Sequence, residues 1–279
     1  MSSAYPNPFP LRDRGRGGGL GVAVSTAQWL RTFTPRPHAR VRLVCFPHAG
    51  GNAAFYRAWP MRLPAHIELC AVQYPGRMDR IDEPLVRAMP EMADRAAAAV
   101  APLCRDGLVV LFGHSLGAAV AYEVARRLAD GPGSGALAGL VVSGLPAPHR
   151  LRGGTVHLAG DATVWAEMGR LGGTDEETLR HPELRDLTLP VLRADYQVAE
   201  TYQPAPAGAL PSPVHAYIGT SDPEVTEDEA MSWVGYSGHS FRLKRFPGDH
   251  FYLVPGLAEV TAEVSRTVDM LAFQQVDAP

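Results

Sequence analysis

The most constraining feature of this chain is a serine between two glycines, placed where an apolar segment gives way to an amphipathic one. Residues 113–117 read Gly-His-Ser-Leu-Gly. The preceding residues 108–112 are all apolar, which is typical of a buried parallel strand. Residues 116–128 have helical spacing and no glycine or proline after position 117, so they predict a helix. The turn between them would lift the Ser115 hydroxyl clear of the backbone at the positive end of that helix.

The two glycines make this junction sterically specific. A side chain at Gly113 or Gly117 would meet the neighbouring strand or helix. A Gly-x-Ser-x-Gly motif alone would arise by chance in about one such chain in ten. With a strand before it and a helix after it, the motif is the nucleophile elbow of an α/β-hydrolase fold. The predicted fold class is therefore α/β, a mostly parallel twisted sheet flanked by helices.

A serine hydroxyl needs a general base, and the base needs a group that orients it. In this fold the two follow the nucleophile as an acid and then a histidine, each in a loop after a strand. Residues 214–218 predict a strand, and Asp222 lies just beyond it. Residues 241–246 predict the next strand, and His250 follows. We therefore predict a catalytic triad of Ser115, Asp222 and His250.

Neighbouring polar residues receive other roles. Asp249 precedes His250 directly, and adjacent side chains seldom fold back onto each other's ring nitrogen, so Asp249 is a poor candidate for the orienting group. His114 lies beside the nucleophile in sequence but points away around the elbow, so we expect it to give packing or polar support. His215 and His239 are expected to be structural.

The oxyanion of an acyl-transfer intermediate needs two hydrogen-bond donors. In this fold one donor is the amide N–H after the nucleophile, here Leu116, and the other comes from the loop after an early core strand. Residues 41–46 predict that strand, and residues 47–51 follow as Pro-His-Ala-Gly-Gly. We predict the backbone N–H of Ala49 as the second donor. The alternative is that this stretch is merely a flexible turn.

With these motifs in order, the chain resembles the type II thioesterases, the stand-alone editing enzymes of polyketide and nonribosomal peptide synthases. The resemblance runs from about residue 28 to residue 273, and its matching stretches are residues 44–51, 73–77, 113–118, 192–196 and 248–253. The family's triad and oxyanion amides fall on the positions selected above. One departure is Asp249, where the family commonly has a glycine.

The resemblance implies a serine thioesterase with no cofactor of its own. Its substrates would be acyl thioesters on the phosphopantetheine arm of acyl or peptidyl carrier proteins, from which it would remove stalled or aberrant acyl groups. Two other readings use the same catalytic residues: a carboxylesterase or lipase acting on oxygen esters, and an acyltransferase or cyclase. A non-enzymatic binding module on this fold usually lacks part of the triad.

Composition fits one enzyme domain. The chain has 279 residues, 46% of them hydrophobic, which is enough for one large core. A net charge of −3 argues against a nucleic-acid partner. The chain has no apolar run long enough to cross a membrane, no secretory signal pattern, and no Cys-x-x-Cys or His-Glu-x-x-His motif, so we expect no membrane and no metal. Cys45 and Cys70 lie in apolar strand-like segments, as expected for free thiols in a reducing cytoplasm.

Two segments depart from the compact pattern. Residues 1–26 are rich in Gly, Pro, Ser and Arg, so we expect a disordered extension before a single domain at 27–279, with a basic interaction arm as the alternative. Residues 146–206 are too many for one crossover helix, and they predict a helical lid over Ser115, with a kink at Pro190. We expect most of its apolar side chains to pack the lid against the core and about a third of them to touch substrate in an acyl chamber. These side chains are Trp165, Met168, Leu171, Leu189, Leu192 and Tyr196.

A carrier protein is typically acidic, so docking would need a local basic patch. Arg77 with Arg80, or Arg150 with Arg152, are the candidates for such a patch. For each pair the simpler expectation is a solvated loop.

Overall fold

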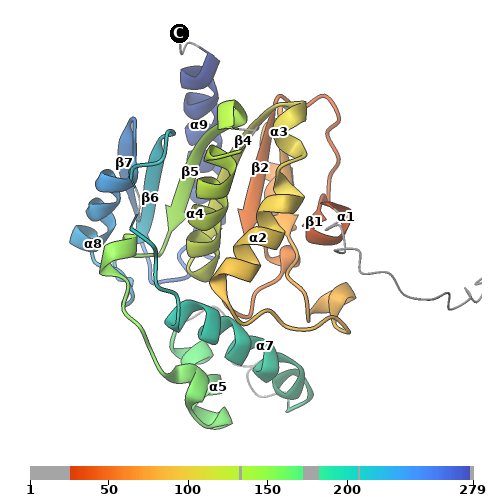
Figure 1. The fold of residues 1–279 in the computed structure, drawn as a ribbon, viewed down its shortest axis with the longest axis vertical. Coiled ribbons are helices and arrows are strands. Elements are labelled where there is room, and N and C mark those ends of the chain that lie inside the picture. The colour runs from red at the N-terminus through yellow and green to blue at the C-terminus, as the bar shows by residue number, and fades with distance from the viewer. Residues whose placement is uncertain (1–25, 132–133, 172–181, 207, 277–279) are drawn as a thin grey trace, which may run out of the picture.

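The computed structural model describes residues 26–131, 134–171, 182–206 and 208–276. Within these ranges, seven strands form one sheet in the order β1-β3-β2-β4-β5-β6-β7 (Figure 1). Only the β1–β3 pair is antiparallel. The predicted α/β-hydrolase fold class is therefore confirmed. The strands are β1 (Leu30–Arg31), β2 (Val41–Phe46), β3 (Ile67–Val72), β4 (Leu108–His114), β5 (Leu137–Ser143), β6 (Val214–Gly219) and β7 (Phe241–Phe246).

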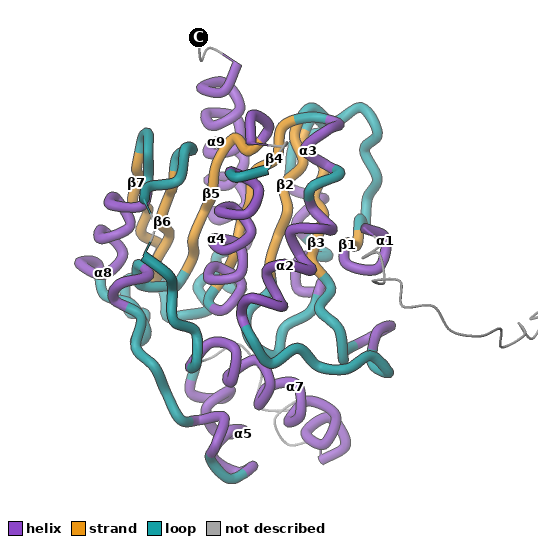
Figure 2. The backbone as a smooth tube through the Cα atoms, viewed as in Figure 1, coloured by secondary structure: helices purple, strands orange, loops and turns teal. Residues whose placement is uncertain are grey.

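Helices cover both faces of the sheet. In Figures 1 and 2, α2 and α4 lie in front of the strands and α9 lies behind them. The central strands are therefore buried on both sides, which explains why the segment before the elbow is continuously apolar rather than alternating. Along it, Leu111 joins the core under α4 and Val110 joins the core under α9. The helices are α1 (Thr26–Trp29), α2 (Met89–Val100), α3 (Leu103–Asp106), α4 (Leu116–Ala129), α5 (Asp161–Arg170), α7 (Pro182–Glu200), α8 (Glu227–Met231) and α9 (Leu257–Val276).

The elbow between β4 and α4 is as tight as the sequence predicts. A Cβ on Gly113 would overlap the backbone of Gly117, and one on Gly117 would overlap the backbone of Phe46 at the end of β2. Ser115 itself has φ 54° and ψ −124°, a conformation that L-residues rarely adopt. Its N–H donates to the carbonyl of Ser143 at 2.8 Å, which ties the turn to β5. The strained serine is therefore held from two neighbouring strands.

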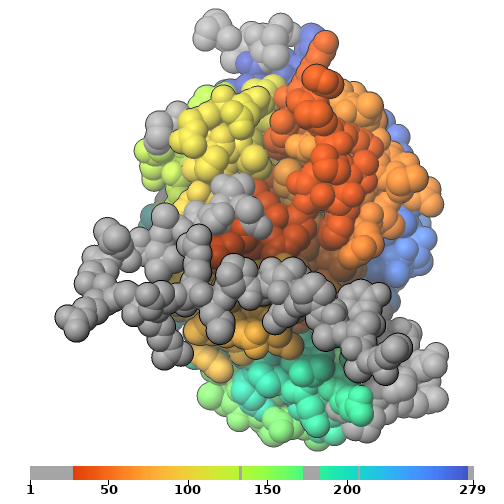
Figure 3. All heavy atoms as spheres, turned by 90° about the vertical axis from the view of Figure 1, so that its right-hand side faces the viewer, coloured from red at the N-terminus to blue at the C-terminus, as the bar shows by residue number. Residues whose placement is uncertain are grey.

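The segment between β5 and β6 carries α5 and α7, which lie at the end of the sheet toward which the parallel strands point (Figure 1). Pro190 lies inside α7. In the space-filling view, the α7 region lies directly beneath the segment after β3 (Figure 3), where Arg87 donates to Gln197 at 3.3 Å. Residues 172–181 of the expected lid fall outside the described residues, as do residues 1–25 of the expected N-terminal extension.

None of the helices in the described ranges is both long enough and apolar enough to cross a bilayer.

Candidate active site

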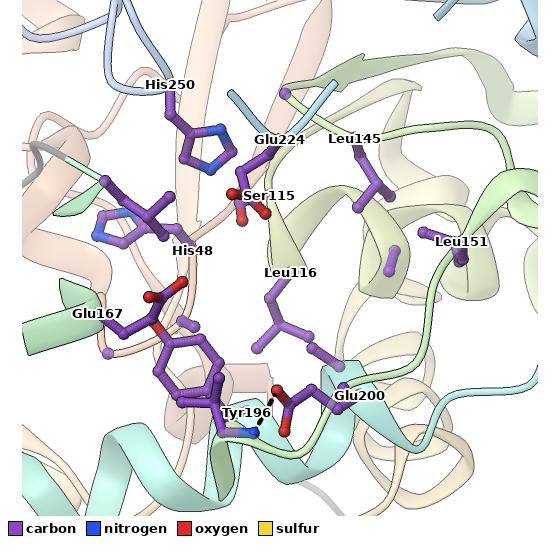
Figure 4. Close-up of a pocket in the computed structure, with 18 of the residues that line it drawn as sticks. His48, Ser115, Leu116, Leu145, Leu151, Glu167, Tyr196, Glu200, Glu224 and His250 are labelled. Atoms are coloured by element: carbon purple, nitrogen blue, oxygen red, sulfur yellow. Dashed lines mark hydrogen bonds between the residues drawn. The ribbon is translucent and has the colours of Figure 1, made fainter. Parts of the chain in front are cut away.

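A cavity of about 380 Å³ opens at the carboxyl edge of the sheet, under α5 and α7 (Figure 4). Ser115 and Leu116 reach it from the elbow, Ala49 from the loop after β2, and His250 from the loop after β7. These residues come from three loops far apart in the sequence. They meet because parallel strands place their carboxyl ends at one edge.

Asp222 and His250 are in direct contact. Both carboxylate oxygens of Asp222 lie 3.0 Å from Nδ1 of His250, and the two side chains are 0% and 1% exposed. The loops that carry them are bonded together, because Ser221 N–H donates to the carbonyl of Gly248 at 2.9 Å. An ionised carboxylate only accepts hydrogen bonds, so Nδ1 carries the hydrogen and Nε2 keeps its lone pair. That tautomer is the one a general base requires.

Ser115 and His250 face the same cavity (Figure 4). Nε2 of His250 has no hydrogen-bond partner in the described part of the chain, so no Ser115–His250 hydrogen bond is formed in this structure. In hydrolases such bonds often tighten only when substrate binds. The structure thus brings Asp222 and His250 together and places Ser115 beside them on one wall.

The two amides expected to hold an oxyanion also border this cavity. Ala49 and Leu116 both line it, and neither N–H donates to an acceptor elsewhere in the described residues. The loop that carries Ala49 is a tight turn, in which Gly51 N–H donates to the carbonyl of His48 at 2.9 Å and Gly50 has φ 75°. This geometry leaves two free donors near Ser115.

Two further histidines lie close to His250: His114 is fully buried, whereas His48 is half-buried and lines the cavity. His114 Nδ1 is 2.9 Å from Ser143 Oγ, which is 2.6 Å from the Tyr252 hydroxyl, so His114 gives the polar support expected of it. Burial, with the charge of His250 as the second cause, lowers the pKa of His48 to about 3. The same two causes lower the pKa of His114. Both rings are therefore neutral near pH 7.

His215, on β6 and outside this cavity, shares this property: burial and then the charge of Arg242 lower its pKa to about 4. Below pH 6.5 the unfolded chain therefore binds protons that His48, His114 and His215 do not take up in the folded state. Stability is full above that pH and falls as the pH drops toward the folded values. Between pH 7 and pH 5 we expect His48 and His215 each to lower the free energy of unfolding by about 2 kcal/mol, because their folded pKa values are about 3 and about 4.

This pH dependence is measured by thermal unfolding between pH 7 and pH 5. The variant His215→Leu should lose less stability over that interval than the wild type, because one proton-binding group has been removed from the unfolded state. His239 is exposed, so His239→Leu is the matched control and should keep the wild-type slope. Equal slopes for His215→Leu and the wild type would contradict the assignment.

Apolar side chains of the α5–α7 segment line part of the cavity. Of the six side chains proposed for it, four line the cavity, namely Met168, Leu171, Leu192 and Tyr196. That about a third of them touch substrate stays a prediction. Leu189 and Trp165 do not line the cavity and pack in the small core of the α5–α7 segment, to which Met168, Leu192 and Tyr196 also belong.

Three carboxylates on the cavity wall had no signal in the sequence: Glu167, Glu200 and Glu224. Arg170 bonds to both Glu167 and Glu224. Glu200 accepts the backbone N–H of His157 at 2.9 Å and so ties α7 to the segment before α5. The cavity therefore has an apolar lining with fixed charges at a few points.

The expectation for Arg77 and Arg80 was wrong. Their side chains are only 7% and 5% exposed, so they form neither a solvated loop nor a docking patch. Arg77 pairs with Asp195 of α7, and Arg80 donates to the carbonyl of Gln73. Sequence analysis missed this pairing because its partners are 118 residues apart. Arg150 and Arg152, in contrast, are exposed as expected and pair with carboxylates of α8.

Comparison with known proteins gives consistent results. The family model for the thioesterase domain matches residues 41–268. Thioesterase PikA5 of Streptomyces venezuelae is 41% identical over 242 residues, covering 87% of this chain and 86% of PikA5. The probable cadicidin biosynthesis thioesterase of Streptomyces griseus is 39% identical over 244 residues, which cover 88% of this chain and 67% of that protein.

Solved structures agree. The type II thioesterase BorB from the borrelidin biosynthetic cluster superimposes with a TM-score of 0.76 at 40% identity, over 85% of this chain and 96% of BorB. The RedJ thioesterase from the prodiginine biosynthetic pathway in Streptomyces coelicolor superimposes with a TM-score of 0.77 at 34% identity, over 83% of this chain and 92% of RedJ.

Proposed function

The chain belongs to the thioesterase family and is a hydrolase of thioesters of the type II, editing kind, and from this premise we propose its substrates and catalytic residues. The substrates are acyl groups on the phosphopantetheine arm of acyl or peptidyl carrier proteins in polyketide or nonribosomal peptide biosynthesis. The observation that carries the catalytic assignment is the contact of Asp222 with His250 Nδ1, beside Ser115 on one cavity wall.

In the proposed first step, His250 Nε2 takes the proton of Ser115 Oγ while the oxygen attacks the thioester carbonyl. The amides of Ala49 and Leu116 donate to the oxyanion. When the intermediate collapses, the carbon–sulfur bond breaks and the thiol leaves with the proton from His250. A thiol has a pKa of about 8.5, so its departure needs less protonation than that of an alcohol.

In the second step, water attacks the acyl-serine and gives its proton to His250, which then returns a proton to Ser115 Oγ as the free acid leaves. Asp222 holds the imidazole in the correct tautomer and stabilises the imidazolium in both steps. The mechanism uses only side chains and backbone amides of this chain, so we propose no cofactor.

We also propose a cytoplasmic location, where acyl chains are assembled on carrier proteins. Cys45, Cys70 and Cys104 are all buried, and none of them forms a disulfide. Burial raises the pKa of each thiol, which keeps them protonated and unreactive. Three buried free thiols support a reducing compartment.

The test is a hydrolysis panel in which one acyl group is presented in three forms: on a carrier protein, on a short pantetheine mimic and as a matched oxygen ester. We expect free acid as the product, detected by mass, and the highest kcat/KM for the carrier-bound thioester. A strong preference for the oxygen ester would indicate a carboxylesterase instead. A cyclic product, or transfer to an added amine or alcohol, would indicate a cyclase or acyltransferase. Equal kcat/KM values for the carrier-bound thioester and the pantetheine mimic would contradict the proposed recognition of a carrier protein.

A further inference from the structure

The loop that carries Ala49, here called the oxyanion loop (residues 47–51), is held by a side chain from a distant helix. The N–H of Gly50 donates to Oδ2 of Asp195 in α7 at 2.7 Å. Asp195 is fully buried and does not line the cavity, so this N–H is directed away from substrate. A peptide plane fixed on one side of Ala49 restricts the rotation of the next one.

Asp195 is in turn fixed by Arg77. The two side chains form two parallel hydrogen bonds, Nη1 to Oδ2 at 2.7 Å and Nη2 to Oδ1 at 2.8 Å. Nη1 of Arg77 also donates to the carbonyl of Gly51 at 3.0 Å. One buried ion pair therefore bonds to both an N–H and a carbonyl of the oxyanion loop. Bidentate arginine–carboxylate pairs fix orientation as well as distance.

Packing adds to these bonds. Gly50 has φ 75°, and a Cβ on it would lie 2.6 Å from Cδ2 of Leu192. Leu192 is three residues before Asp195 on α7 and lines the cavity. The oxyanion loop thus packs directly on α7. The turn of α7 that forms part of the cavity wall therefore also fixes the position of this loop.

We propose that Arg77 and Asp195 are positioning residues for the oxyanion hole. Through Gly50 and Gly51 they keep the Ala49 N–H facing Ser115, and they make this part of α7 a fixed wall. The inference rests on the proposed role of Ala49. An oxyanion forms only during reaction, so a displaced donor lowers kcat and leaves KM nearly unchanged. A misplacement of about 1 Å is enough to cost on the order of a hundredfold in rate.

The first test compares Asp195→Ala with Asp195→Asn. We expect Asp195→Ala to lower kcat by about 10- to 100-fold with KM changed less than about threefold. Asp195→Asn keeps an oxygen that accepts from Gly50 N–H, so it should recover part of this loss. A fall in kcat in both variants to the same level, with no rescue by asparagine, would contradict the role of the Gly50 hydrogen bond.

Asp195→Ala leaves the Arg77 guanidinium buried without its ion-pair partner. An uncompensated buried charge destabilises the folded state strongly, so this variant can fail to fold. The double variant Arg77→Met/Asp195→Leu removes both charges at similar volume and should fold. It still lacks the acceptor for Gly50, so its kcat should remain about 10- to 100-fold low. Wild-type kcat in this folded double variant would overturn the proposal.

The control is a half-buried ion pair at the opposite end of the parallel strands. Arg42 and Glu68, on β2 and β3, are 2.8 Å apart and each 12% exposed. Arg42→Met/Glu68→Leu should change thermal stability but not kcat. An equal loss of kcat in both double variants would mean that the loss comes from general destabilisation and would overturn the proposal.

A boronic acid inhibitor gives a readout that does not depend on the natural substrate. Bound to Ser115, it places an oxygen in the oxyanion hole, so its Ki should rise in parallel with the fall in kcat across the Asp195 and Arg77 variants. The affinity of the product acid should stay within about threefold. Because the wild type binds the boronic acid whatever ester it prefers, this arm separates failure of the inference from failure of the proposed substrate. An unchanged Ki in variants with low kcat would refute the positioning role.

Discussion

Ser115→Ala is expected to lower turnover by on the order of a thousandfold or more. Without the hydroxyl no acyl-enzyme forms, and the remaining amides stabilise only direct attack by water. Fluorophosphonate labelling should disappear together with hydrolysis of the acyl-thioester substrate. Alanine is smaller than serine and the Ser115 side chain makes no hydrogen bond within the described residues, so the melting temperature should change little.

Ser232→Ala is the matched control for that experiment. Ser232 lies at the end of α8 and outside the cavity, where its hydroxyl donates to the carbonyl of Asp228. This variant should keep wild-type turnover and labelling. Labelling of Ser115→Ala at the wild-type rate, or retention of more than about a tenth of its turnover, would show that another residue is the nucleophile.

The elements that position the site were predictable because each has a local signature. The apolar run before Ser115, the glycines around it and the strands before Asp222 and His250 depend on neighbours within about ten residues. The structure places β4, β6 and β7 over those segments. The order of strands in the sheet has no such signature, because it depends on pairing between distant segments.

The Arg77–Asp195 pair could not be predicted from the sequence either, because it also joins distant segments. From the sequence, Arg77 is expected in a solvated loop, and Asp195 is given no role of its own. Only the folded chain puts the two in contact, under the oxyanion loop. A buried ion pair has no sequence period, unlike an apolar face, so no pattern indicated it. The carboxylates on the cavity wall, such as Glu167 and Glu224, were missed for the same reason.

Asp222→Asn is the second substitution with a large expected effect, and it tests a different part of the site. An asparagine fits the same space, but its amide group can donate to Nδ1 of His250 and so favour the tautomer with the hydrogen on Nε2. That tautomer cannot accept the Ser115 proton. Turnover should fall by about 10³- to 10⁴-fold, in line with the equivalent change in a serine protease.

The control for Asp222→Asn is Asp249→Asn, one residue from the imidazole in sequence. Asp249 is exposed, and its carboxylate accepts the N–H of Phe251 at 2.9 Å rather than a hydrogen of the His250 ring. We would measure kcat and KM of both variants on one thioester and use their melting temperatures to show that each is folded. The comparison shows whether Asp222 acts by orienting the His250 ring or only by placing a negative charge near it. If nearby negative charge were what matters, both variants would lose activity to a similar extent. If the tautomer matters, as the 3.0 Å contact of Asp222 with Nδ1 implies, only Asp222→Asn is strongly impaired.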